Sequence, residues 1–221
     1  MPSTTGTTTS SVRQPARRAA RGTDPASGVI GIAGGTAAIA GFVVLVVRAA
    51  SDGTGGAAFV VGVALYGACL IYRFTMSAVA SFAGRRGALG VLDEAGSFFL
   101  PAGTMMPVAF SFLDGALRWT LFGLAWAYAI VGFLLYLALL GGFRRYAVSV
   151  GYLFFFMVLP LIGPVRAALG EAAFGWLFAG GAVFAFGLLF RGKRSFPYAD
   201  ALWNAVALAG ASLQYAGLSS L

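Results

Sequence analysis

The sequence predicts an all-α integral membrane protein built as a bundle of seven transmembrane helices. Of the 221 residues, 59% are hydrophobic. They form seven long runs, and basic residues are concentrated in every second connection between the runs. The hydrocarbon layer of a membrane is about 30 Å thick, so a helix needs roughly 20 apolar residues to cross it. Barrel strands would alternate polar and apolar residues, which these runs do not.

Each run matches, or comes close to, the length of one membrane crossing. The predicted spans are, in order, Val29–Val47, Ala57–Ala83, Ala95–Leu113, Trp119–Phe143, Tyr146–Val165, Ala172–Phe190 and Ala201–Leu221. Nearly every residue after Val29 belongs to a span or to a hinge, the short connection between two spans. Residues 29–221 are therefore predicted to form one membrane domain. Residues 1–28 are rich in Ser, Thr, Gly, Pro and Arg and are expected to form a disordered, basic cytoplasmic tail.

The distribution of basic residues predicts which side of the membrane each hinge faces. Lys and Arg in short loops stay on the cytoplasmic side. The larger group lies in the tail and in the second, fourth and sixth hinges: Arg13, Arg17, Arg18, Arg21, Arg85, Arg86, Arg144, Arg145, Arg191, Lys193 and Arg194. The remaining hinges hold Arg48, Arg118 and Arg166. The N-terminus is therefore predicted to be cytoplasmic and the C-terminus outside.

The net charge of +8 would suggest nucleic-acid binding in a soluble protein. Here the charge lies in flanks that face anionic lipid, so the lipid bilayer is the expected partner and nucleic acid is not. The predicted location is the cell membrane, with several crossings. Cys69 is the single cysteine and lies within a span, where it is expected to pack as a small apolar residue.

Arg73 is the most unusual residue, because it lies inside the second predicted span. An arginine at that depth costs about 2.5–3.5 kcal/mol on insertion scales. An acidic partner at ~4 Å returns about 4 kcal/mol if the effective dielectric constant is about 20. Asp93 and Asp200 are the candidate partners. Alternatively, the side chain of Arg73 extends along its own helix to the cytoplasmic headgroups.

Several other polar residues are predicted to reach the same cytoplasmic level of the bundle. Polar groups within or near spans mark functional sites in membrane proteins. The predicted pocket contains Arg73, Ser77, Ser81, Asp93, Asp200 and Asn204. The alternative for Asp93 and Asp200 is that each begins a helix, where a carboxylate complements the helix dipole.

From about Leu65 onward, the chain resembles the hemolysin III family, the bacterial branch of the progestin and adipoQ receptor superfamily. The third span has Leu92-Asp93, Ala102-Gly103-Thr104 and Pro107, where the family reads Leu-Asp-His and Ala-Gly-Thr-Tyr-Thr-Pro. The last two spans carry further matches at the family's spacing: Ala179-Gly180-Gly181, Phe184, Gly187, Pro197-Tyr198, Trp203 and Gly210.

The resemblance implies a zinc ion near the cytoplasmic side, held by three histidines and adjoined by an aspartate. The aspartate is kept as Asp93, and a serine of the second-span motif corresponds to Ser77. The histidine positions read Ser81, Asp200 and Asn204, a further family histidine reads Gln214, and the chain contains no histidine. Zinc is therefore not expected, and no catalytic residue is assigned, although Asp93 would be the candidate. We expect a network of Arg73 with Asp93 or Asp200 in its place; an oxygen site for Mg²⁺ or Ca²⁺ is the alternative.

Three functions are open at this point. The first is a non-catalytic family member, a pseudoenzyme that binds a lipid ligand or a partner protein. The second is a metal-dependent membrane lipid amidase that uses an oxygen-ligated metal, as the family's relatives suggest. The third is a channel or pore-former, which the sequence supports least because it contains no continuous polar track along one helix.

Overall fold

The computed structural model describes residues 24–51, 56–138, 162–188 and 198–220, and the regular structure in these ranges is entirely helical. The helices are α2 (Pro25–Ser51), α3 (Gly56–Ala83), α4 (Gly87–Phe112), α5 (Gly115–Ala138), α7 (Ile162–Leu169), α8 (Glu171–Leu188) and α9 (Ala199–Ser219). The described residues contain no strand, which confirms the all-α class.

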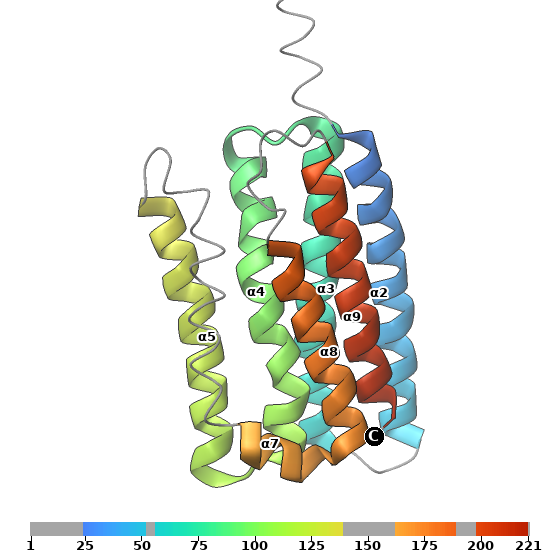
Figure 1. The fold of residues 1–221 in the computed structure, drawn as a ribbon, viewed down its shortest axis with the longest axis vertical. Coiled ribbons are helices and arrows are strands. Elements are labelled where there is room, and N and C mark those ends of the chain that lie inside the picture. Colours follow the sequence, from blue (N-terminus) through green and yellow to red (C-terminus); the bar gives the residue numbers. More distant parts are fainter. Residues whose placement is uncertain (1–23, 52–55, 139–161, 189–197, 221) are drawn as a thin grey trace, which may run out of the picture.

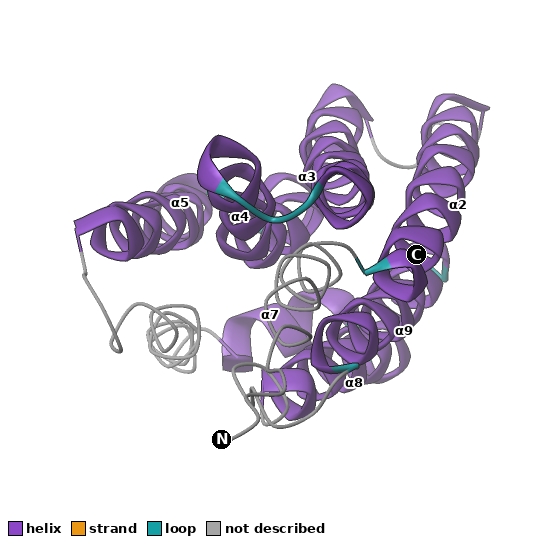
Figure 2. Cartoon of the chain, turned by 90° about the horizontal axis from the view of Figure 1, so that it is seen from above, coloured by secondary structure: helices purple, strands orange, loops and turns teal. Residues whose placement is uncertain are grey.

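The long helices stand side by side (Figure 1). Seen from above, α5, α4, α3 and α2 follow one another around the bundle, and α9 and α8 continue the arc beside α2 (Figure 2). The closest packing joins α3 to both α2 and α4, and α8 to α9. The upper end of the bundle in Figure 1 contains the starts of α2, α4 and α9 and the end of α3.

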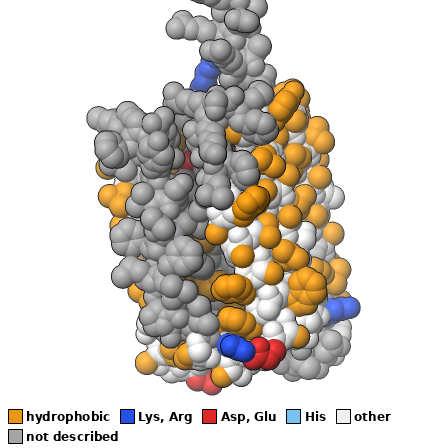
Figure 3. Space-filling model, viewed as in Figure 1, with side chains coloured by type: hydrophobic (Ala, Val, Ile, Leu, Met, Phe, Trp, Pro, Cys, Tyr) orange, Lys and Arg blue, Asp and Glu red, His pale blue; other side chains and the backbone are white. Residues whose placement is uncertain are grey.

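The outer surface of the bundle is apolar, as a membrane requires. In the described part of the chain, four helices are long and apolar enough to cross a membrane, namely α2, α3, α4 and α5, and α8 is apolar but shorter. Large apolar side chains such as Ile32, Leu134 and Phe178 are exposed on the outside. In Figure 3, apolar side chains cover much of the described face, and charged side chains gather near its lower end. These are the features of a multi-pass α-helical membrane protein.

The first helix begins earlier than the sequence pattern indicates. α2 starts at Pro25, whereas the predicted span starts at Val29 and the predicted tail extends to residue 28. The carboxylate of Asp24 accepts a hydrogen bond of 3.2 Å from the backbone N–H of Ser27, as a helix-capping residue does. Proline also suits the first position of a helix. Residues 1–23 of the predicted tail lie outside the described residues.

α4 also begins earlier than predicted, at Gly87 instead of Ala95. The turn between α3 and α4 contains Gly84 and Gly87, whose φ angles of 91° and 54° fall in the left-handed region that glycine favours. Because of this tight turn, α4 begins only four residues after the last residue of α3. Asp93 therefore lies more than one turn inside α4, and the alternative that Asp93 begins the helix is wrong.

The fifth predicted span, Tyr146–Val165, falls largely on residues outside the described part of the chain. Its last residues, from Ile162, begin the short helix α7. Arg166 of α7 forms an ion pair of 2.8 Å with Glu171, at the start of α8. The described helices α8 and α9 correspond to the sixth and seventh predicted spans.

Candidate functional site

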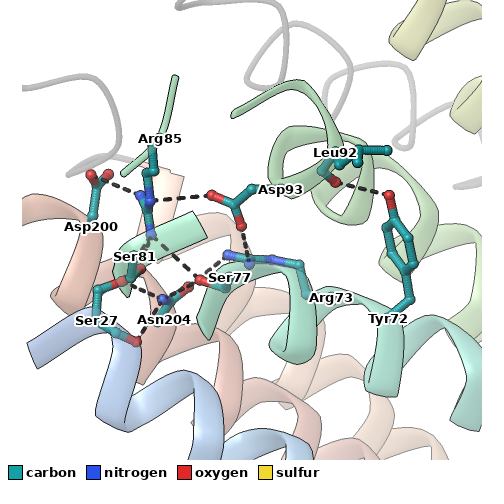
Figure 4. A network of polar contacts seen from close by, with 10 residues as sticks. All are labelled: Ser27, Tyr72, Arg73, Ser77, Ser81, Arg85, Leu92, Asp93, Asp200 and Asn204. Carbon is teal, nitrogen blue, oxygen red and sulfur yellow. Dashed lines mark hydrogen bonds and ion pairs between the residues drawn. The ribbon is translucent and has the colours of Figure 1, made fainter. Parts of the chain in front are cut away.

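Polar side chains from α2, α3, α4, α9 and the α3–α4 turn meet at the upper end of the bundle (Figure 4). The group, called the polar network below, consists of Ser27, Arg73, Ser77, Ser81, Arg85, Asp93, Asp200 and Asn204. The structure brings together all six residues of the predicted pocket. It adds Ser27 and Arg85, which the sequence did not indicate.

Arg73 lies at the buried side of the polar network, and only 2% of its surface is exposed. Its Nη1 donates a hydrogen bond of 3.1 Å to Oδ1 of Asp93, and its Nη2 donates one of 2.7 Å to Oδ1 of Asn204. The side chain is therefore held inside the bundle instead of extending to the headgroups. A charge in this environment needs both a partner charge and hydrogen bonds, and Arg73 has both.

Close backbone packing makes room for Arg73. A Cβ atom at Gly96 of α4 would lie 3.0 Å from both Cα and Cδ of Arg73. Since side chains rarely approach that closely, a larger residue at position 96 would displace the arginine stem. Glycine at this position thus lets α4 pass close to α3 and bring Asp93 to the guanidinium.

Asn204 is fully buried and uses both ends of its amide. Its oxygen accepts from Arg73, and its Nδ2 donates to the hydroxyl oxygens of Ser27 and Ser77, each at 2.6 Å. These bonds tie α9 to α2 and α3. They also fix the orientation of the amide, because the oxygen has to face the cation.

Arg85 covers the polar network from the α3–α4 turn. Its Nη1 lies 2.8 Å from Oδ2 of Asp200, and its Nε lies 3.3 Å from Oδ2 of Asp93. Its Nη2 donates hydrogen bonds to the hydroxyls of Ser27 at 2.8 Å and Ser81 at 3.0 Å. Arg85 was predicted to be an ordinary cytoplasmic flanking residue, but the structure turns its guanidinium inward.

The carboxylates of Asp93 and Asp200 pair with the two arginines in a way that the sequence did not predict. Asp93 contacts both guanidinium groups, whereas Asp200 contacts Arg85 and not Arg73. The Asp93 side chain is 8% exposed and the Asp200 side chain 57%. The Arg73–Asp93 pair is therefore buried, while the Arg85–Asp200 pair borders solvent or headgroups. Asp200 also lies in the first turn of α9, where it complements the helix dipole.

The side chains present here do not suit a zinc ion. Zinc in proteins takes thiolate, imidazole or carboxylate ligands, usually at least three of them. Of the three positions where the family has histidine, Ser81 and Asn204 offer neutral oxygens, and the Asn204 oxygen already accepts from Arg73. Asp200 faces Arg85. Two guanidinium groups thus lie where a metal cation would have to sit, and like charges repel at this distance.

A second polar contact lies deeper in the bundle. The hydroxyl of Thr104 in α4 lies 3.4 Å from Oε1 of Gln214 in α9, and both side chains are buried. The hydroxyl of Tyr66 in α3 donates to the backbone oxygen of Ala211 at 3.3 Å. These contacts connect α9 to α3 and α4 below the polar network.

Comparison with known proteins agrees with the resemblance in the sequence. The family described as haemolysin-III related matches residues 23–198, which is more than half of the chain. A hemolysin-3 homolog of Bacillus subtilis (strain 168) is 26% identical over 127 residues. That similarity covers 58% of this chain and spans 60% of the relative's length. No solved structure matches the chain.

Proposed function

Because the chain belongs to the haemolysin-III-related family, we propose that it is a zinc-free member of that family without catalytic activity. In this proposal the polar network of two arginines and two aspartates takes the place of a metal centre. The protein then acts by binding, with a lipid or a partner protein as its ligand. The observation that carries the proposal is the burial of Arg73 between Asp93 and Asn204.

The chemistry of the polar network supports a non-catalytic role. A general base has to be free to accept a proton. Asp93 instead faces two guanidinium groups, and the chain has no histidine that could replace it. The amide of Asn204 is likewise committed to Arg73, Ser27 and Ser77. The ion pairs and hydrogen bonds of Asp93 and Asn204 therefore stabilise the bundle and oppose a role of these two side chains in acid–base catalysis.

Metal content tests this proposal directly. We expect the detergent-purified protein to contain zinc, magnesium, calcium and manganese well below one ion per chain when measured by elemental mass spectrometry. The Asp200→Ala variant should give the same values. Near-stoichiometric metal in the unchanged protein that is lost in Asp200→Ala would contradict the proposal and favour a lipid amidase with an oxygen-ligated metal.

The proposal includes seven crossings with the N-terminus in the cytoplasm and the C-terminus outside. α5 ends at the upper end of the bundle in Figure 1, whereas α7 begins at the lower end. Because these described ends of α5 and α7 lie at opposite ends of the bundle, they support the proposed fifth span. α2 begins at the upper end and α9 ends at the lower end, as an odd number of crossings requires. The basic residues of the sequence favour the upper end as the cytoplasmic one.

Cysteine labelling in intact cells tests this orientation. The chain has one cysteine, Cys69, which is buried and can be replaced by Ala. In that background, Ser220→Cys at the end of α9 should react with a membrane-impermeant maleimide from outside the cell. Ala88→Cys, an exposed position at the start of α4, should react only after the cells are permeabilised. The reverse pattern, or both positions reacting from one side, would contradict the proposed topology.

A further inference from the structure

An apolar groove runs along the outside of the bundle between α2, α3 and α9. It has a volume of about 410 Å³. Its walls include Ala37, Gly41 and Leu45 of α2, Leu70 of α3, and Ala211 and Tyr215 of α9. The groove begins one helical turn from the polar network, since Leu208 lines it and lies four residues after Asn204. It is therefore a separate feature of the molecule.

The sequence of α2 explains why this surface is hollow. The helix carries a series of small residues on the groove side, so it forms a shallow wall instead of filling the space beside α3 and α9. Although α2 packs against α9, the backbones of α3 and α9 come close to each other at few positions. In a membrane, a hollow that opens to the outside of the bundle faces the hydrocarbon chains of lipids.

A basic residue marks one end of the groove. Arg48 lies three residues after Leu45, so both side chains project from the same side of α2. The Nη1 atom of Arg48 lies 3.5 Å from the backbone oxygen of Ser219, near the end of α9. The exposed guanidinium thus bridges the two helices at the membrane boundary. An arginine fork is well suited to bind the oxygens of a phosphate group.

We propose that the groove binds one acyl chain of an anionic phospholipid, whose phosphate Arg48 holds. The combination of an apolar channel that opens to lipid with a cation at its end matches the two parts of such a molecule. The inference is independent of whether the polar network is catalytic. The proposed orientation of the protein decides only in which leaflet the lipid lies. With the end of α9 outside, the lipid lies in the outer leaflet.

A second copy of the chain is a less suitable occupant. A symmetric dimer would set the same surface against itself, so a hollow would face a hollow. It would also bring two copies of Arg48 toward each other, and like charges in an apolar setting repel strongly. A flexible acyl chain fills a hollow without either difficulty.

Photocrosslinking in lipid nanodiscs tests the site. The probes are phosphatidylglycerol and phosphatidylcholine, each with a diazirine on one acyl chain, and labelled peptides are mapped by mass spectrometry. We expect phosphatidylglycerol to label the groove segments of α2 and α9 several-fold more than phosphatidylcholine does, because the choline cation next to the phosphate repels the guanidinium of Arg48. Arg48→Gln should remove this preference between headgroups.

Two variants that fill the groove provide independent evidence. Ala37 and Ser212 are exposed and line the groove from opposite sides, so Ala37→Phe and Ser212→Phe add a ring without displacing core residues. Each should reduce groove labelling several-fold. The matched control is Ala127→Phe, at an exposed alanine of α5 away from the groove, which should leave the labelling unchanged.

Three results would overturn the inference. The first is equal labelling of the unchanged protein by the two probes, which would indicate ordinary surrounding lipid. The second is groove labelling that both filling variants leave at the level of Ala127→Phe. The third is a crosslink between groove segments of two chains when the nanodiscs are treated with a bifunctional protein crosslinker, which would assign the groove to a second copy.

Discussion

Replacing Asp93 with Asn is expected to lower the free energy of unfolding by about 3–5 kcal/mol, the usual cost of removing one partner from a buried ion pair. Arg73 would keep its hydrogen bond to Asn204 but lose its counter-charge inside the bundle. Arg85 would lose the same carboxylate, so two guanidinium groups would face each other. For a chain of this size, the melting temperature should fall on the order of 10 °C. Thermal unfolding in detergent, followed by far-UV circular dichroism, measures this change.

Asp200→Asn is the matched control for that experiment. Its side chain is 57% exposed and pairs with Arg85 at the border of the polar network. An exposed ion pair contributes about 1 kcal/mol or less. Asp200→Asn should therefore shift the melting temperature much less than Asp93→Asn. Equal effects of the two substitutions would mean that the burial of the Arg73–Asp93 pair has no special energetic role.

In the proposed zinc-free protein, the two arginines balance the charge of the two carboxylates. Two guanidinium groups and two carboxylates have no net charge, and the serine hydroxyls and the Asn204 amide add hydrogen bonds between the helices. A buried ion pair with additional hydrogen bonds is tolerated where an isolated charge is not. The polar network can therefore hold together α2, α3, α4 and α9 without an ion.

The helical class and the position of Arg73 could be predicted because both depend on strong local signals. Long apolar runs have few alternatives in a membrane, and a charge within such a run stands out. That Asp93 and Asn204 lie near Arg73 followed from the predicted topology, which places the ends of separate helices at one level.

Arg85 and Ser27 could not be identified in the same way. A basic residue after a span is common at the cytoplasmic surface. The inward contacts of Arg85 depend on the three-dimensional course of the α3–α4 turn, where Gly84 and Gly87 have positive φ angles. Ser27 falls in a polar segment with the composition of a disordered tail. The Asp24-Pro25 pair was the sequence signal that could have identified Ser27 as helical. The pair resembles the start of a helix, and it places Ser27 in the first turn. Asp200, the other candidate partner of Arg73, instead forms an ion pair with Arg85. That contact depends on side-chain geometry, which sequence spacing does not give.

Replacing Arg73 with Met is expected to lower the free energy of unfolding by less than Asp93→Asn does, about 1–3 kcal/mol. Asp93 would then lose one hydrogen bond but remain beside Arg85, and the unbranched Met fills part of the space. Asn204 would keep its bonds to Ser27 and Ser77. Thermal unfolding of both single variants and the double variant gives the coupling between the two positions.

The double variant Arg73→Met/Asp93→Asn is expected to be more stable than Asp93→Asn alone. It removes the unpaired buried cation that makes Asp93→Asn costly, and apolar replacements of buried ion pairs are often close to neutral. For this result the coupling has to exceed the cost of Arg73→Met alone, so it should be about 3 kcal/mol, the upper end of the range measured for contacting residues. Additive losses in the double variant would show that the two side chains do not act as a pair. The buried guanidinium would then lack the energetic role that the proposed function gives it.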